Sequence, residues 1–86
     1  MSEVIVRNPA TRRNIVNYMI TYYMENNRQP SVREIGHAVG ITSTSTMAGY
    51  LTRMVNEGSL ARNDDNARRI YSVTEYGRET YGLARA

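Results

Sequence analysis

The chain has 86 residues, enough for one small domain, and no apolar run approaches the ~20 residues that a membrane helix requires. Cysteine is absent, which excludes disulfides, thiolate metal sites and cysteine nucleophiles. All eleven basic residues are arginine, against eight acidic residues, so the net charge is +3 and lysine chemistry is excluded as well. The absence of cysteine makes a reducing, cytoplasmic setting the default expectation. His37 is the single histidine, and we expect no cofactor and no metal.

Arginine is the cation best suited to nucleic acid. Its planar guanidinium binds phosphates and guanine edges through two parallel hydrogen bonds. Codon bias in a GC-rich genome would give the same composition, so the positions of the arginines are more informative than their number.

The first expected helix runs from about Pro9 to Glu25, after an N-terminal arm over residues 1–8. Asn8 is suited to cap it, and proline is favoured at the first helical position. The polar stretch 26–30, which ends in proline, terminates the helix. Apolar side chains recur at helical spacing along one face: Ile15, Val16, Met19, Ile20, Tyr22, Tyr23 and Met24.

Two shorter helices follow. Ser31 and Glu34 form a capping box that starts the second helix, and Gly40 ends it as a left-handed cap. Ser43 caps the third helix, which Gly58 ends. About four residues that include a glycine join these helices, which is the spacing of a helix-turn-helix. The expected inward residues are Val32, Ile35 and Val39 in the second helix and Met47, Leu51, Met54 and Val55 in the third.

A β-hairpin and a last helix complete the chain. Residues 59–62 and 69–73 are the expected strands, and the polar segment 63–67 between them predicts a turn. Thr74 is placed to cap a last helix over residues 75–83. The element order is α-α-α-β-β-α, a mainly α fold with a small β-hairpin. The expected apolar contacts of the last helix are Tyr76 and Leu83, with Tyr81 as a further candidate.

This order resembles a known family at the level of individual residues. Over residues 11–73 the chain resembles the winged helix-turn-helix of LexA-type DNA-binding domains. The stretch 73–79 is more similar to the wing exit of MarR-like and PadR-like regulators. We therefore expect residues 9–86 to form one winged helix-turn-helix domain with a C-terminal helix. The resemblance rests on Gln29-Pro30-Ser31-Val32-Arg33-Glu34-Ile35-Gly36, Val39-Gly40-Ile41-Thr42-Ser43, Tyr50-Leu51 and Asn56-Glu57-Gly58-Ser59-Leu60.

The resemblance implies sequence-specific binding of double-stranded DNA by a small, repressor-like transcriptional regulator, such as those of phages and mobile elements. LexA-type domains carry an asparagine and paired glutamates near the start of the recognition helix. Here Ser45, Ala48 and Gly49 stand at those positions, so the base preference is not carried over. The self-cleaving domain of that family is not expected, because the chain has no lysine for its Ser/Lys chemistry.

The third helix is the expected reader of bases. Its outward residues Ser45, Gly49 and Thr52 are small, which lets the helix backbone approach the floor of the major groove. The methyl group of Thr46 can contact a thymine methyl. Arg53 at the flank is expected to be the more base-specific contact. The alternative is that this small-residue face packs against another helix.

Phosphate contacts are expected around the reader. Ser31 and Ser43 at helix starts, with Arg33 beside the first, suit phosphates, although capping alone would explain both serines. The hairpin arginines suit the minor groove or the backbone, and the alternative is a solvated hairpin with internal Arg–Asp pairs. These hairpin residues are Arg62, Arg68 and Arg69.

Two functions from different classes remain. The first is DNA binding as a homodimer, with a dimer surface built from tyrosines of the first and last helices. The second is a winged-helix module that binds and inhibits a host protein. An enzyme is not expected, since the residues offer no catalytic constellation.

Overall fold

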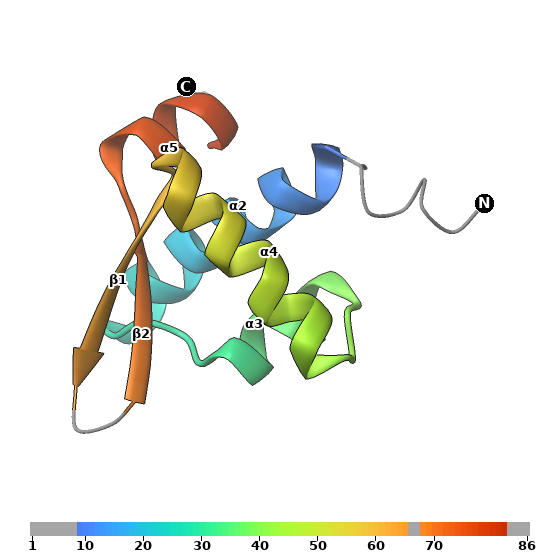
Figure 1. Cartoon of the computed structure of the whole chain (residues 1–86). Coiled ribbons are helices and arrows are strands. Elements are labelled where there is room, and N and C mark those ends of the chain that lie inside the picture. The colour runs from blue at the N-terminus through green and yellow to red at the C-terminus, as the bar shows by residue number, and fades with distance from the viewer. Residues whose placement is uncertain (1–8, 66–67, 83–86) are drawn as a thin grey trace.

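A computed structural model describes residues 9–65 and 68–82 of the chain. Its elements follow the predicted order, which confirms the mainly helical, winged helix-turn-helix fold (Figure 1). The expected N-terminal arm, residues 1–8, lies outside the described residues. The elements are α2 (Pro9–Asn26), α3 (Val32–Val39), α4 (Thr44–Glu57), β1 (Leu60–Asp65), β2 (Arg68–Val73) and α5 (Glu75–Tyr81).

The ends of α3 and α4 are set by the caps that the sequence predicts. The Ser31 hydroxyl accepts from the backbone N–H of Glu34 at 3.1 Å, and the Glu34 carboxylate accepts from the N–H of Ser31 at 2.8 Å. Both halves of the capping box are therefore present. Ser43 caps α4 by accepting from the N–H of Thr46. A glycine in the left-handed region ends each helix, with φ of 81° and 95°.

The core lies where α2, α3, α4 and the hairpin meet. The predicted inward faces of α3 and α4 are confirmed, and two tyrosines add to them. The predicted stripe of α2 is wrong at its last turn, where Tyr23 is 48% and Met24 is 76% exposed, because the core covers only the middle of that helix. The buried apolar residues are Ile15, Val16, Met19, Ile35, Met47, Tyr50, Leu51, Met54, Leu60 and Tyr71.

The hairpin is longer than predicted. β1 and β2 pair antiparallel over their full lengths. Residues 63–65 belong to β1, so the prediction of a turn over these residues is wrong. The register sets Asp64 opposite Arg69, and opposite charges across a strand pair offset the low strand preference of aspartate.

The last helix, α5, packs against α2 and, through a glycine, against the segment before β1. Gly77 is buried, and a Cβ there would collide with the carbonyl oxygen of Ser59. Tyr76 is 55% exposed, so its prediction as an apolar contact is wrong. The helix contacts Ser59 through its backbone at Gly77 instead. Tyr81 packs against the core, as predicted for the further candidate, and Leu83 lies outside the described residues.

Glu57, the last residue of α4, joins three other parts of the fold. Its carboxylate accepts from Arg12 Nη1 at 2.9 Å, from the Tyr81 hydroxyl at 2.9 Å and from the hydroxyl of buried Ser59. A negative charge at a helix C-terminus is unfavourable, and these three donors offset that cost. The contacts tie α4 to α2, to α5 and to the segment before β1.

Gly36→Ala is expected to destabilise the protein by about 1–3 kcal/mol, the usual cost of overpacking. Gly36 is buried in α3, and a Cβ there would lie 2.6 Å from the carbonyl oxygen of Ile41, in the turn that leads to α4. Gly49→Ala in α4 is the matched control. A Cβ there meets nothing within 4 Å, so alanine should stabilise that helix by about 1 kcal/mol. Urea unfolding followed by circular dichroism measures both, and a Gly36→Ala variant as stable as the wild type would contradict the close approach.

Candidate nucleic-acid interface

The outer face of α4 carries small polar side chains and is open to solvent. Ser45, Thr46 and Thr52 are exposed, as is the longer Arg53 beside them. Gly49 is half-buried, with open space where a Cβ would lie. The opposite face of the same helix is buried in the core. Within the described part of the chain, this small-residue face is therefore not a packing surface for another helix.

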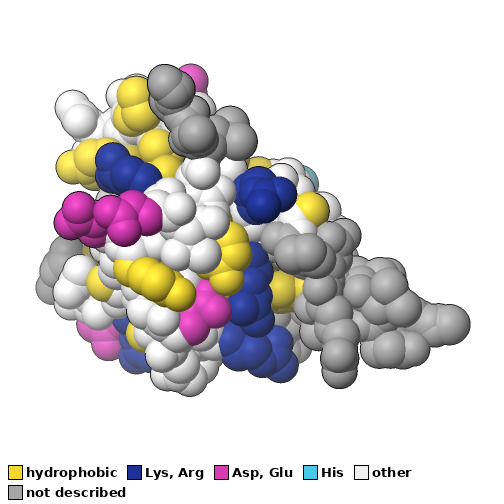
Figure 2. Space-filling model, turned by 90° about the horizontal axis from the view of Figure 1, so that it is seen from above, with side chains coloured by type: hydrophobic (Ala, Val, Ile, Leu, Met, Phe, Trp, Pro, Cys, Tyr) yellow, Lys and Arg dark blue, Asp and Glu magenta, His cyan; other side chains and the backbone are white. Residues whose placement is uncertain are grey.

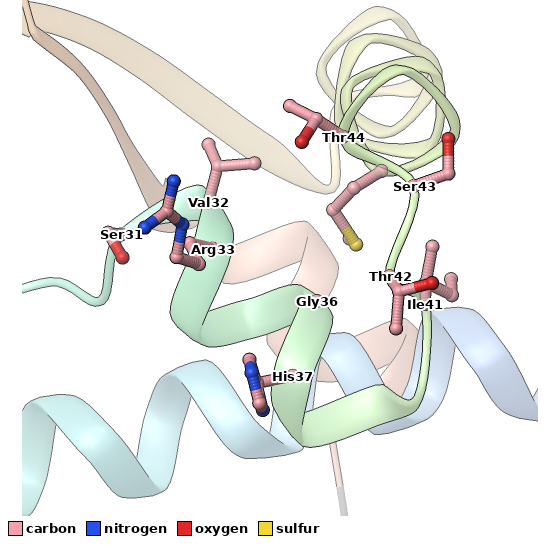
Figure 3. A pocket seen from close by; sticks show the side chains of 10 residues that line it. Ser31, Val32, Arg33, Gly36, His37, Ile41, Thr42, Ser43 and Thr44 are labelled. Atoms are coloured by element: carbon pink, nitrogen blue, oxygen red, sulfur yellow. The ribbon is translucent and has the colours of Figure 1, made fainter.

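Beside this face lies a hollow of about 540 Å³ between α3 and the start of α4, named here the α3–α4 hollow. It brings together Ser31, Arg33 and Ser43, three of the predicted phosphate contacts (Figure 3). Arg33 and His37 lie on the α3 side, and the hydroxyl side chains of residues 42–44 lie on the other side (Figure 3). A concave surface with a guanidinium group and several hydroxyl donors suits an anionic ligand.

A second hollow, of about 670 Å³, lies between the start of α3 and the hairpin and is named the α3–wing hollow. Ser31 and Val32 line both hollows, so the two are adjacent at the start of α3. Arg28 and Gln29 were not among the predicted site residues, because the sequence does not indicate that the loop before α3 lies near the hairpin. The full lining is Arg28, Gln29, Pro30, Ser31, Val32, Arg69 and Ile70.

The hairpin arginines differ from one another in their surroundings. Arg62 donates through Nε and Nη2 to the carboxylate of Asp64 at 3.1 and 3.2 Å, which is the internal pair that the alternative interpretation anticipates. That hydrogen bond lowers the pKa of Asp64 and raises the pKa of Arg62. Arg69 lines the α3–wing hollow, whereas the side chain of Arg68 lies outside the described residues.

These features lie on one side of the molecule. The starts of α3 and α4 and the lower ends of β1 and β2 are all on the lower side in Figure 1. Figure 2 looks onto the opposite side, which carries α5, and there arginine side chains lie next to acidic ones. Arg12 and Glu57 form an ion pair, at 2.9 Å. The side with the two hollows is therefore the candidate nucleic-acid interface.

Glu34 organises the start of α3 behind this interface. Besides closing the capping box, its carboxylate accepts from the Tyr22 hydroxyl at 3.1 Å and lies 4.0 Å from Arg28. The hydrogen bond from the Ser31 backbone is the main reason that the pKa of Glu34 is lowered, and Tyr22 and Arg28 lower it further. Glu34 is thus held in its charged form.

The described residues include no group of three or more His, Cys, Asp or Glu side chains placed to hold a metal ion. Within residues 9–65 and 68–82, no helix has both the length and the apolar character needed to span a membrane.

Comparison with known proteins matches the same elements. The family model described as LexA DNA binding domain matches residues 9–69, from the start of α2 into β2. A LexA repressor of Leuconostoc mesenteroides is 43% identical over 61 residues, covering 70% of this chain and 29% of that protein. A LexA repressor of Staphylococcus aureus is 39% identical over 61 residues, covering 71% of this chain and 30% of its own length. The chain thus spans less than a third of these relatives. No solved structure matches it significantly.

Glu34→Gln is expected to reduce the loss of stability in acid. Hydrogen bonds to the carboxylate lower its folded-state pKa below the unfolded value of about 4.3, so ionised Glu34 stabilises the fold above that pH. This contribution disappears as the pH falls through the folded-state pKa. Glutamine keeps the capping geometry but does not titrate.

The free energy of unfolding, measured by urea between pH 7 and pH 3, should fall less steeply for Glu34→Gln than for the wild type. Glu79→Gln, at an exposed position of α5, controls for the loss of one carboxylate. Parallel pH profiles for the wild type and Glu34→Gln would show that Glu34 does not contribute.

Proposed function

The chain belongs to the family of LexA DNA-binding domains, and we propose that it binds double-stranded DNA sequence-specifically as a small transcriptional regulator of the repressor type. One observation supports this best: an exposed helix face of small polar side chains lies beside two adjacent hollows that are lined by arginines. The relatives with which it shares residues 9–69 are named repressors. A regulator of this kind acts on DNA in the cytoplasm.

In the proposed complex, α4 lies in the major groove. Ser45 and Gly49 leave room for the helix backbone to approach the base edges, and the Thr52 hydroxyl can donate to or accept from several bases. The methyl group of Thr46 provides an apolar contact for thymine. Arg53, which is long and exposed, can form two hydrogen bonds with one guanine.

Phosphate contacts set the register of α4 on the duplex. Ser31 and Ser43 cap their helices, and the helix N-termini beside them favour negative charge. Arg33 adds a cation to the same concave surface. The proposed wing contacts to the backbone or the minor groove come from Arg62, Arg68 and Arg69.

We propose that two copies bind a two-fold symmetric site. A domain of this size contacts few base pairs, and tight specific binding usually needs two half-sites. The tyrosines expected at the dimer surface are only partly available, because Tyr22 donates to Glu34 and Tyr81 donates to Glu57. Tyr76 is exposed and remains a candidate for this surface.

A host protein in place of DNA is the competing function. No observation on the described residues favours it, and its salt dependence would differ from that of DNA binding, because an interface built on aromatic contacts depends weakly on salt. We propose no catalytic role, since lysine and cysteine are absent and His37 is the single histidine.

The purified chain is expected to enrich a duplex from a random library at physiological salt. Its affinity for that duplex should fall linearly on a double-logarithmic plot against salt, with a slope of about −0.9 for each phosphate neutralised. Fluorescence anisotropy with labelled duplexes measures this. If no duplex is enriched, or if affinity is insensitive to salt, DNA binding is wrong and a protein partner is favoured.

Arg53→Ala is expected to cost about 1–3 kcal/mol on the selected duplex and much less on a random duplex, because the guanidinium reads a base. Arg78→Ala in α5 removes the same charge from an exposed position outside the interface and should leave both affinities unchanged. Equal losses by Arg53→Ala on both duplexes would assign it to a phosphate.

A further inference from the structure

The α3–wing hollow lies between the start of α3 and the hairpin, on the same side of the molecule as the start of α4 (Figure 1). Both α4 and the hairpin approach DNA in the proposed complex. α4 occupies the major groove, and the hairpin approaches the adjacent minor groove. One sugar–phosphate backbone separates two adjacent grooves, so that strand must pass between α4 and the hairpin. The hollow, of about 670 Å³, is the concave surface on its path.

We propose that the α3–wing hollow binds this backbone strand, and that Arg28 contacts its phosphate from the loop wall while Arg69 faces it from the hairpin wall. The inference rests on the proposed function and adds to it a residue that sequence reasoning did not select. The ligand is a phosphodiester of double-stranded DNA, so the contact is expected to favour no particular base.

Arg28 is exposed, but its guanidinium is positioned by two neighbouring side chains. Its guanidinium carbon lies 5.1 Å from the centre of the Tyr22 ring, which is a cation–π distance. One guanidinium nitrogen lies 4.0 Å from a carboxylate oxygen of Glu34, which is too long for a hydrogen bond. The side chain is 63% exposed, so a ligand in the hollow can reach its donors.

Glu34 orients Arg28 without neutralising it. The carboxylate accepts from the Ser31 backbone N–H at 2.8 Å and from the Tyr22 hydroxyl at 3.1 Å, both closer than Arg28. A phosphate at hydrogen-bonding distance would attract the guanidinium more strongly than a carboxylate at 4.0 Å. Tyr22, which contacts both Arg28 and Glu34, is a positioning residue. Arg28 is thereby preorganised, which reduces the entropy that it loses on binding.

The opposite wall supplies the second cation. Asp64 lies opposite Arg69 in the strand register and interacts with its charge, but both of its side-chain hydrogen bonds are to Arg62. Two guanidinium groups that share one hollow repel each other, and an anion between them would relieve that repulsion. The remaining lining includes the apolar residues Pro30, Val32 and Ile70.

Arg28→Gln tests the contact directly. The variant is expected to lose about tenfold in affinity at physiological salt on both the selected duplex and a random duplex. Its salt slope should become shallower by about 0.9. Arg28→Lys keeps the charge but not the fork, so it should keep the slope with a smaller loss. The matched control is Arg78→Gln in α5, on the side shown in Figure 2, which should bind like the wild type.

The outcomes are distinguishable. If Arg28→Gln binds as tightly as Arg78→Gln while the wild type binds with a normal salt slope, the inference is overturned and the proposed function stands. If the wild type itself shows no salt-dependent binding, the proposed function is overturned. A loss confined to the selected duplex would make Arg28 a base contact and overturn its assignment to the backbone.

A duplex with single methylphosphonate substitutions separates a phosphate contact from a structural effect. The wild type should lose affinity when the phosphate in the hollow is made neutral, and Arg28→Gln should lose nothing further at that position. Tyr22→Phe keeps the ring beside Arg28 but removes the hydroxyl bond to Glu34, so it should show a smaller loss than Arg28→Gln. Additive losses at every phosphate position would overturn the direct contact, and urea unfolding of each variant controls for stability.

Discussion

The burial of one face of α4 is the constraint on which the rest of the structure depends. Met47, Leu51 and Met54 are almost completely buried. Turning the helix about its axis would expose these side chains, at a cost of about 1.5–3 kcal/mol for each. Because the opposite face of the helix must then point outward, Ser45 and Thr52 are presented to solvent. The candidate reading face is thus a consequence of how the core is packed.

The two ends of α4 are fixed by different means. At its start, the close approach of Gly36 to the carbonyl of Ile41 holds the turn, and Ser43 caps the helix. At its end, Glu57 accepts hydrogen bonds from α2, from α5 and from the segment before β1, including one from Arg12. A helix fixed at both ends and carrying short side chains loses little conformational entropy on binding. Rigidity therefore compensates for the small size of the contacts that the face can make.

Features that depend on residues close in sequence could be predicted, and those that depend on distant contacts could not. The caps of α3 and α4 are hydrogen bonds between residues three apart, so both were predicted correctly. Residues 63–65 were predicted as a turn because their strand pairing depends on residues 68–70 across the hairpin. Tyr76 was predicted inward because nothing local shows that Gly77 packs against Ser59. Among the residues that line the two hollows, Ser31 and Ser43 were predicted from their caps and Arg33 from its place beside Ser31. The place of Arg28 depends on how the loop before α3 meets the hairpin.

A reading face made of hydroxyls and a glycine distinguishes bases weakly, because serine and threonine hydroxyls pair with several base edges. Selectivity must then come from few strong contacts and from the shape of the duplex. In the proposed complex, the strong contact comes from Arg53, an exposed side chain of α4 that can form two hydrogen bonds with one guanine. Selectivity through the shape of the duplex requires that the protein hold the backbone on both sides of the major groove. A sequence that bends or narrows easily then binds more tightly. In the proposed complex, the arginines on both walls of the α3–wing hollow and Arg33 in the α3–α4 hollow hold the backbone. Sequence preference in this protein is therefore expected to extend to base pairs that no side chain touches.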